Sequence, residues 1–227
     1  NRDLGYNKSE VISIPIGSSV NPERALEQMR HKLENQTWVQ GVSASDINLG
    51  RGRDGAMTNT VFGFDYQERQ IYTHVMRVDY DFLKTMEINL LEGRDFNRSF
   101  ATDVKAVLIN KKMAESLGGI EQVLNKTIEL DENVQVIGMI EDFNFKDLKQ
   151  TVGALTLSIN PLLSPVEYIF VRVESDNLKY SLDRVQEVWK ELFPDINFLG
   201  SYLDENAERM YRNEKRMSRI VISASGI

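Results

Sequence analysis

Two pairs of carboxylates are the side chains of this chain best placed to do chemistry. Asp79 and Asp81 flank a single tyrosine, and Glu141 and Asp142 are neighbours in the sequence. Paired carboxylates can serve as general acid and base or bind a divalent cation, although a calcium loop needs further oxygen ligands and a glycine turn. Aspartate is also common in helix caps and turns. The sequence favours these capping and turn roles, and an enzyme whose four carboxylates meet in a cleft stays open as an alternative.

Other sequence motifs of catalysis or cofactor binding are absent or incomplete. The chain has no cysteine, which excludes disulfides, thiolate nucleophiles and cysteine zinc sites. His31 and His74 lack acidic or histidine partners at metal-ligand spacing. The segment Gly50-Arg-Gly-Arg-Asp-Gly55 lacks the Gly-Lys-Ser/Thr ending of a phosphate loop and predicts a flexible crossing loop. We therefore predict a non-enzymatic protein with no catalytic residue, cofactor or metal.

Composition and charge narrow the class of partner. The chain has 227 residues, 41% of them apolar, with 34 acidic against 27 basic residues and a net charge of −7. A cationic face is what phosphate binding needs, so nucleic acid is excluded as the main partner. The chain starts without Met and stops in the uncharged stretch Ile220–Ile227, and we expect both ends to have been cut from something longer.

The elements that hold these residues begin with a βαβ unit. Val11–Ile16 predicts a strand, and Asn21 followed by Pro22 marks the start of a helix. The apolar residues of that helix recur at helical spacing, so one face is expected to be buried. Trp38–Ile47 predicts the second strand of the unit.

The same order returns near the other end of the chain. Tyr168–Val173 predicts a strand, Asn177–Leu192 a helix that ends before Pro194, and Phe198–Leu203 a second strand. Two such units are typical of a ferredoxin-like sheet with helices on one face. Because the two units lie far apart in the sequence, this module must carry an insertion.

The residues between the two units predict a mixed α+β subdomain. Val61–Phe64 and Ile71–Val78 are expected to form a hairpin joined at Gln67–Gln70. Thr127–Leu130 and Val134–Ile140 are expected to pair in the same way. The predicted fold is therefore α+β, a porter-like, ferredoxin-like module of two βαβ units with an inserted mixed subdomain.

The last segment predicts a long helix that starts at Asp204 as its N-cap and runs to Ser225. Its basic residues precede an apolar run, as in a helix that enters a membrane, and we expect them to contact lipid headgroups. They are Arg209, Arg212, Lys215, Arg216 and Arg219. We predict that 209–227 is the start of a transmembrane helix.

Short motifs follow one another along nearly the whole chain, and the chain resembles a known family through them. They are Asp3-Leu-Gly-Tyr6, Val78–Ile88, Leu91-Glu-Gly-Arg-Asp-Phe96, Val107-Leu-Ile-Asn110 with Leu117-Gly118, Val136–Phe145, and Tyr202-Leu-Asp-Glu205 with Tyr211 and Glu214. In this order they are similar to the MacB-like periplasmic core domain of MacB/FtsX-type ABC transporter permeases, especially the long-domain versions of Bacteroidetes-like bacteria. The loop Gly41–Met57 matches no family pattern, and the sequence assigns it no role.

The resemblance implies a division of the chain and structural roles for the motifs. Residues 1–48 and 166–208 would form the porter-like module, and 49–165 a Sabre-like inserted subdomain. In this interpretation Gly93 permits a tight turn after the strand end at Leu90-Leu91, Gly138 lets backbones approach, and the two phenylalanines pack the insertion onto the porter module. The motif residues are Asp79, Phe82, Gly93, Arg94, Phe96, Asn110, Gly138, Asp142, Phe143 and Phe145.

The resemblance also implies a function at the cell inner membrane. The chain would be the extracytoplasmic (periplasmic) domain of an ABC transporter permease, transmitting ATP-driven motion to a substrate or partner. Its partners would be its own transmembrane helices, a cytoplasmic ATP-binding subunit and the membrane surface, with a second permease copy or a periplasmic adaptor as further candidates. The membrane-proximal residues would be Arg212, Lys215, Arg216 and Arg219. A periplasmic ligand-binding or sensor module, with a pocket between its subdomains, is the alternative.

Overall fold

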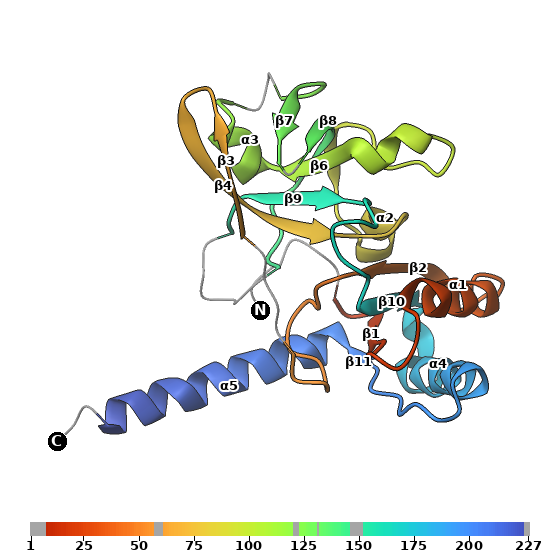
Figure 1. Cartoon of the computed structure of the whole chain (residues 1–227). Helices are drawn as coiled ribbons and strands as arrows, with labels where there is room; N and C mark the ends of the chain where they lie inside the picture. Colours follow the sequence, from red (N-terminus) through yellow and green to blue (C-terminus); the bar gives the residue numbers. More distant parts are fainter. Residues whose placement is uncertain (1–7, 57–60, 120–122, 131, 146–151, 225–227) are drawn as a thin grey trace.

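The computed structural model of the chain describes residues 8–56, 61–119, 123–130, 132–145 and 152–224. These residues form two β-sheets, one above the other, and a long C-terminal helix that leads away from both (Figure 1). The motif at residues 3–6 lies outside the described residues. The fold is mixed α+β, as the sequence predicts.

The first sheet, here called the porter-like sheet, is built from strands at the two ends of the chain. Its order is β11-β1-β10-β2, and every neighbouring pair is antiparallel. Helices α1 (Pro22–Leu33) and α4 (Leu178–Leu192) pack on one face. This arrangement confirms the predicted ferredoxin-like fold. The strands are β1 (Val11–Pro15), β2 (Val39–Ser45), β10 (Tyr168–Val173) and β11 (Ser201–Tyr202).

Local capping explains where the two helices start. The Asn21 side chain accepts a hydrogen bond from the backbone N–H of Arg24 at 3.0 Å, and proline occupies the first helical position of α1. Asn177 caps α4 in the same way, accepting from Tyr180 N at 3.0 Å. The apolar faces that follow are buried against the sheet, with Trp189 of α4 fully enclosed.

The second sheet, the insertion sheet, lies between β2 and β10 in the chain. Its order is β3-β4-β9-β6-β8-β5, with β7 paired to β8, and it mixes parallel and antiparallel neighbours. Short helices α2 (Phe82–Met86) and α3 (Lys111–Ser116) and the 3₁₀ helix η1 (Ala101–Lys105) connect its strands. The strands are β3 (Val61–Tyr66), β4 (Arg69–Arg77), β5 (Leu90–Gly93), β6 (Ala106–Asn110), β7 (Thr127–Glu129), β8 (Asn133–Ile140) and β9 (Leu155–Ser158).

The β3–β4 hairpin is tighter than the sequence predicts. Only Gln67 and Glu68 separate the two strands, with φ of 49° and 62°. A two-residue turn with positive φ at both positions matches the twist of the paired strands, so Arg69 and Gln70 join the ladder instead of the turn.

The two sheets share a buried core. Successive residues of β1 point to opposite faces, so Ile12 and Ile14 pack under α1 and α4 while Val11 joins the cluster beneath the insertion. Strand β10 is buried along its whole length because both of its faces are covered. Phe170 of β10 and Phe82 of α2 lie in edge contact, with ring centroids 6.1 Å apart.

Helix α5 (Leu203–Ala224) follows β11 directly and extends away from the body (Figure 1). The helix starts at Leu203, so the expected cap at Asp204 is wrong: Asp204 lies in the first turn, where its carboxylate accepts from Glu205 N at 2.7 Å. Within the described part of the chain, none of the helices has the length and apolar character that crossing a membrane requires. The side chains of Lys215, Arg216 and Arg219 lie outside the described residues.

Candidate functional site at the junction of the two sheets and helix α5

The first carboxylate pair binds arginines at the edge where the insertion meets α1. Asp79 forms an ion pair with Arg30 of α1 and lies 3.9 Å from Arg98. Arg98 also pairs with Asp81 at 2.5 Å and lies over the ring of Tyr80. Asp81 occupies the N-cap position of α2, as the sequence favours, but it has φ 63° and its side chain accepts no cap hydrogen bond. Asp79 therefore joins the insertion to α1, whereas the pair of Asp81 and Arg98 lies within the insertion.

The second carboxylate pair lies elsewhere and has its own partners. Glu141 accepts a hydrogen bond from the side chain of Asn89 at 2.9 Å, and Asp142 accepts one from Lys112 N, in the first turn of α3, at 3.1 Å. All four carboxylates are among the described residues, where no cluster of three acidic, histidine or cysteine side chains suits a metal ion. An enzyme built on these four groups would need them to converge, and they do not.

The histidines sit in different environments. His31 is exposed on α1. His74 on β4 is more buried than the half-buried position expected, and its ring centroid lies 5.3 Å from that of Phe145. A ring packed against an aromatic core is part of the packing of this sheet.

The motif Glu92-Gly-Arg-Asp-Phe96 is organised around an ion pair whose carboxylate is buried. Arg94 binds both oxygens of Asp103, at 2.8 and 2.7 Å, and its guanidinium lies 4.8 Å from the ring centroid of Phe100. The Asp103 side chain is 1% exposed and also accepts from Asn97 N. The hydrogen bonds from Arg94 lower the pKa of Asp103. Sequence reasoning missed Asp103, because nothing in a single aspartate nine residues downstream marks it as the partner.

The two motif glycines face each other across a strand pair. Gly93, with φ +77°, is the last residue of β5 and pairs with Gly138 of β8, so the expected turn after Leu91 is wrong. A Cβ at Gly138 would lie 2.5 Å from the carbonyl oxygen of Arg94. The close approach of the two backbones explains why neither position has a side chain.

The remaining motif residues sit in the insertion and its core. Asn110 accepts from Met113 N at the start of α3 and from Leu155 N of β9, and donates to Gly153 O. Phe143 and Phe145 pack together, 5.9 Å between ring centroids, in the buried cluster that also holds Phe170 of the porter-like sheet. The other two aromatic motif residues, Phe82 and Phe96, belong to the same cluster.

A half-buried carboxyl holds together the two segments that cross between the sheets. Asp46 follows β2, and its two carboxylate oxygens accept from Arg77 N at 2.9 Å and from the hydroxyl of Ser164 at 2.7 Å. Ser164 lies on the segment that returns to β10. Burial raises the pKa of Asp46 to about 6. The sequence offers no signal for this contact, which links residues far apart in the chain.

The glycine-rich loop 50–55 is fixed against α5, although the sequence predicts a flexible loop. Arg51 N donates to Asn206 O at 3.1 Å, and Arg209 Nε donates to Arg51 O at 3.0 Å. Tyr168 of β10 donates its hydroxyl hydrogen to Asp54 at 2.8 Å. Arg209 therefore faces the body of the protein, and the expected headgroup role is wrong for this residue of the basic run. Arg212, one turn later, is 72% exposed.

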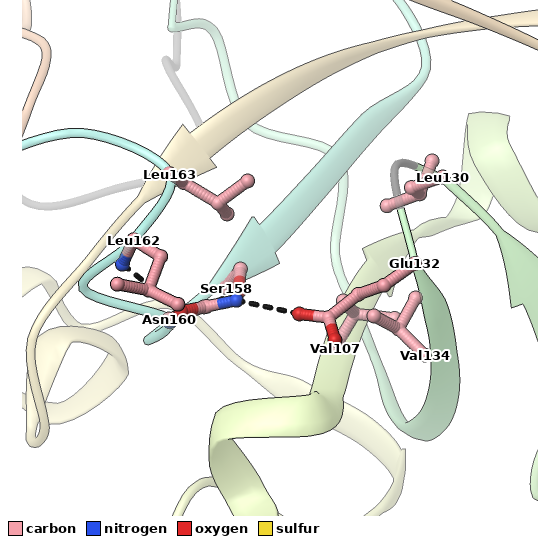
Figure 2. A pocket seen from close by; sticks show the side chains of 8 residues that line it. All are labelled: Val107, Leu130, Glu132, Val134, Ser158, Asn160, Leu162 and Leu163. Carbon is pink, nitrogen blue, oxygen red and sulfur yellow. Dashed lines mark hydrogen bonds between the residues drawn. The ribbon is translucent and has the colours of Figure 1, made fainter.

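A hollow of about 250 Å³ opens on the insertion (Figure 2). Asn160 and Glu132 are hydrogen-bonded across it at 2.7 Å, and Leu162 beside it is 90% exposed. The lining residues are Val107, Leu130, Glu132, Val134, Ser158, Asn160, Leu162 and Leu163. Every one of them belongs to the insertion, so this hollow is not the pocket between subdomains that the ligand-binding alternative requires.

Solved structures of transporter domains share this fold. The periplasmic region of MacB from Actinobacillus actinomycetemcomitans is 15% identical, with a TM-score of 0.62, over 91% of this chain and 94% of that one. The extracellular domain of the noncanonic ABC-type transporter YknZ from Gram-positive bacteria is 17% identical, with a TM-score of 0.58, over 85% and 98%. A domain described as part of a Porphyromonas gingivalis permease protein is 18% identical, with a TM-score of 0.51, over 86% and 89%.

The family follows from the sequence itself. No curated protein matches the chain closely enough to count as a relative. The family model of the MacB-like periplasmic core domain matches residues 6–186, which is most of the chain and includes every described strand except β11. The chain therefore belongs to the family of MacB-like periplasmic core domains, the extracytoplasmic domains of ABC transporter permeases.

Proposed function

We propose that this domain transmits ATP-driven motion across the cell inner membrane to a substrate or partner on the periplasmic side. The observation that carries the proposal is that the first turns of α5 are packed into the core. Leu203, Ala207 and Met210 are all buried, and the first two belong to the cluster between the sheets. A packed core transmits displacement instead of absorbing it, so a movement of α5 would reach both sheets.

The proposal assigns a part to each region of the chain. Residues 1–48 and 166–208 form the porter-like module and act as the rigid lever. The Sabre-like insertion, 49–165, presents the recognition surface, and 209–227 begins the transmembrane helix. Its membrane-proximal basic residues, Arg212, Lys215, Arg216 and Arg219, contact lipid headgroups. The domain itself is non-enzymatic, since ATP is hydrolysed by a cytoplasmic subunit. A second permease copy or a periplasmic adaptor is the partner we propose outside the membrane.

Hydrogen exchange in the full permease tests this function without a known substrate. The permease and its ATP-binding subunit are reconstituted in lipid, and exchange in the periplasmic domain is compared with and without a non-hydrolysable ATP analogue. We expect nucleotide bound on the opposite side of the membrane to change exchange in the first turns of α5 and in both sheets. An unchanged domain, with nucleotide bound, contradicts the proposal.

A crosslink gives the matching control. This chain has no cysteine, so pairs introduced at residues 3–6 and along α5 meet no other thiol within the domain. Oxidation of a pair that crosslinks should abolish the nucleotide response of the domain while ATP binding persists, and reduction should restore it.

A further inference from the structure

Loop 50–55 grips the first turns of α5 through its backbone. Both backbone hydrogen-bonding groups of Arg51 bind the helix: its N–H donates to Asn206 O at 3.1 Å, and its carbonyl accepts from Arg209 Nε at 3.0 Å. Gly50, with φ +81°, lets the loop come this close, because a Cβ there would lie 3.0 Å from Ala207 N. Because the backbone N–H and C=O of Arg51 are both hydrogen-bonded to α5, the loop has little freedom to move independently of the helix.

Arg209 ties three parts of the protein together. Besides the loop carbonyl, its guanidinium donates to the hydroxyl of Ser201 on β11 at 2.7 Å and to the side-chain oxygen of Asn206. The hydroxyl of Ser201 also lies 2.7 Å from that same oxygen. Ser201 and Asn206 are almost completely buried, at 1% and 0% exposed. The base of α5 therefore packs on the edge of the porter-like sheet on one side and on the loop on the other.

The far side of the loop is anchored separately. Asp54 accepts from the hydroxyl of Tyr168, which lies on β10 in the centre of the porter-like sheet. The burial of that hydroxyl and its bond to Asp54 raise the pKa of Tyr168, so it stays a donor at physiological pH. By contrast, Arg53 and Glu205 lie 4.0 Å apart with both side chains 44% exposed, and such a surface pair contributes little.

We infer that loop 50–55 and Arg209 form a collar that fixes the direction in which α5 leaves the domain, and that motion of α5 reaches the insertion through this collar. This inference rests on the proposed function. The chain continues from the loop to β3, the first strand of the insertion. Arg209 is in this sense a positioning residue: it sets the angle between the helix and the two sheets.

Spin-label distances in the full permease test the collar. Cysteines at Ser218 on α5 and at the exposed Lys190 on α4 report the angle of the helix against the porter-like sheet. We expect a narrow distance distribution in the parent protein and a clearly wider one in Arg209→Gln. Gly50→Ala should widen the distance distribution as well, because its Cβ pushes the loop away from α5 while Arg209 is kept. This second variant tests the collar even if Arg209→Gln fails to fold.

Two matched controls separate the collar from general damage. Glu208→Gln changes a side chain of α5 next to Arg209 that is 75% exposed and meets only Arg212 among the described contacts, at 3.5 Å. Gly17→Ala introduces the same backbone strain as Gly50→Ala, since Gly17 has φ +75°, but nothing lies within 4 Å of its Cβ. Both controls should keep the narrow distribution.

The nucleotide response then distinguishes the inference from the proposed function. A wide distribution in Arg209→Gln together with a lost exchange response in the insertion supports both. A distribution as narrow as that of the parent protein, or an insertion that still responds fully, overturns the collar as the route and leaves the packed core as the link. A parent protein whose domain never responds to nucleotide overturns the proposed function, even if the collar variants still widen the distribution.

Discussion

At the scale of single residues, the charged motif positions are used to hold the fold together. Arg94 and Asp103 form a two-pronged pair with the carboxylate enclosed, and Asp79 meets Arg30 across the edge between the two sheets. A buried carboxylate needs such a partner, because leaving it alone costs several kcal/mol. These ion pairs therefore connect separate segments of the fold.

Asp46 is expected to make the free energy of unfolding depend on pH. Its folded pKa of about 6 lies above that of free aspartate, so the carboxyl contributes stability when protonated and loses that contribution as the pH rises through 6. The free energy of unfolding of the wild type, compared with that of Asp46→Asn, should fall between pH 4 and pH 7 by up to about 3 kcal/mol. Urea unfolding at several pH values measures it.

The control for this effect is Asp65→Asn, an exposed position on the β3–β4 hairpin. It should leave the pH dependence of stability as it is in the wild type. If the wild type and Asp46→Asn keep a constant difference over the whole range, the carboxyl is not held in a desolvated site.

At the scale of elements, the sequence predicts what local rules control and misses what distant contacts control. The starts of α1, α3 and α4 follow from Asn21, Asn110 and Asn177, since a cap acts within three residues. The clamped loop 50–55 could not be predicted, because its partners on α5 lie at the other end of the chain. Gly93 was misplaced for the same reason: its strand partner, Gly138, is remote in sequence.

The close contact between β5 and β8 at their glycines can be tested by substitution. Gly138→Ala would place a methyl group 2.5 Å from the Arg94 carbonyl oxygen. This oxygen belongs to the backbone, which cannot easily move away. We expect a loss of about 1–3 kcal/mol in the free energy of unfolding. Gly63→Ala is the matched control, because its Cβ would meet only the ring of Tyr72, at 3.0 Å, on an exposed side chain that can turn away. Equal costs for the two variants would show that β5 and β8 have room to separate.

At the scale of the whole molecule, the two sheets share one buried core, and we expect them to unfold together. The central cluster takes residues from both sheets and from α5, including Val11, Phe143 and Leu203. The fold class and the split arrangement of the porter-like sheet could be predicted from the repeated βαβ pattern. The packing of Phe143 and Phe145 between the two sheets is expected only through the family resemblance, because an apolar strand pattern does not show what covers each face.

Phe143→Ala tests this sharing. Phe143 is fully buried in the insertion, so its removal should cost about 3–5 kcal/mol. Trp189 is enclosed under the porter-like sheet and reports on that part by fluorescence, while far-UV circular dichroism reports on the whole chain. Both signals should move together to lower denaturant concentration. An insertion that unfolds first, with the tryptophan signal unchanged, would mean that the sheets are energetically independent.

The position of the insertion has one more consequence. Strands β2 and β10 are neighbours, and Ser45 pairs with Tyr168, so the insertion enters and leaves the porter-like sheet at one pair of adjacent strand ends. A different unit could be exchanged at this point without altering the strand order of the sheet beneath. Any such unit would have to bring an apolar underside, because Val11 and Phe170 would otherwise face water. The fold therefore constrains only the underside of a replacement unit, which packs on the porter-like sheet. The outer face of that unit is free to differ.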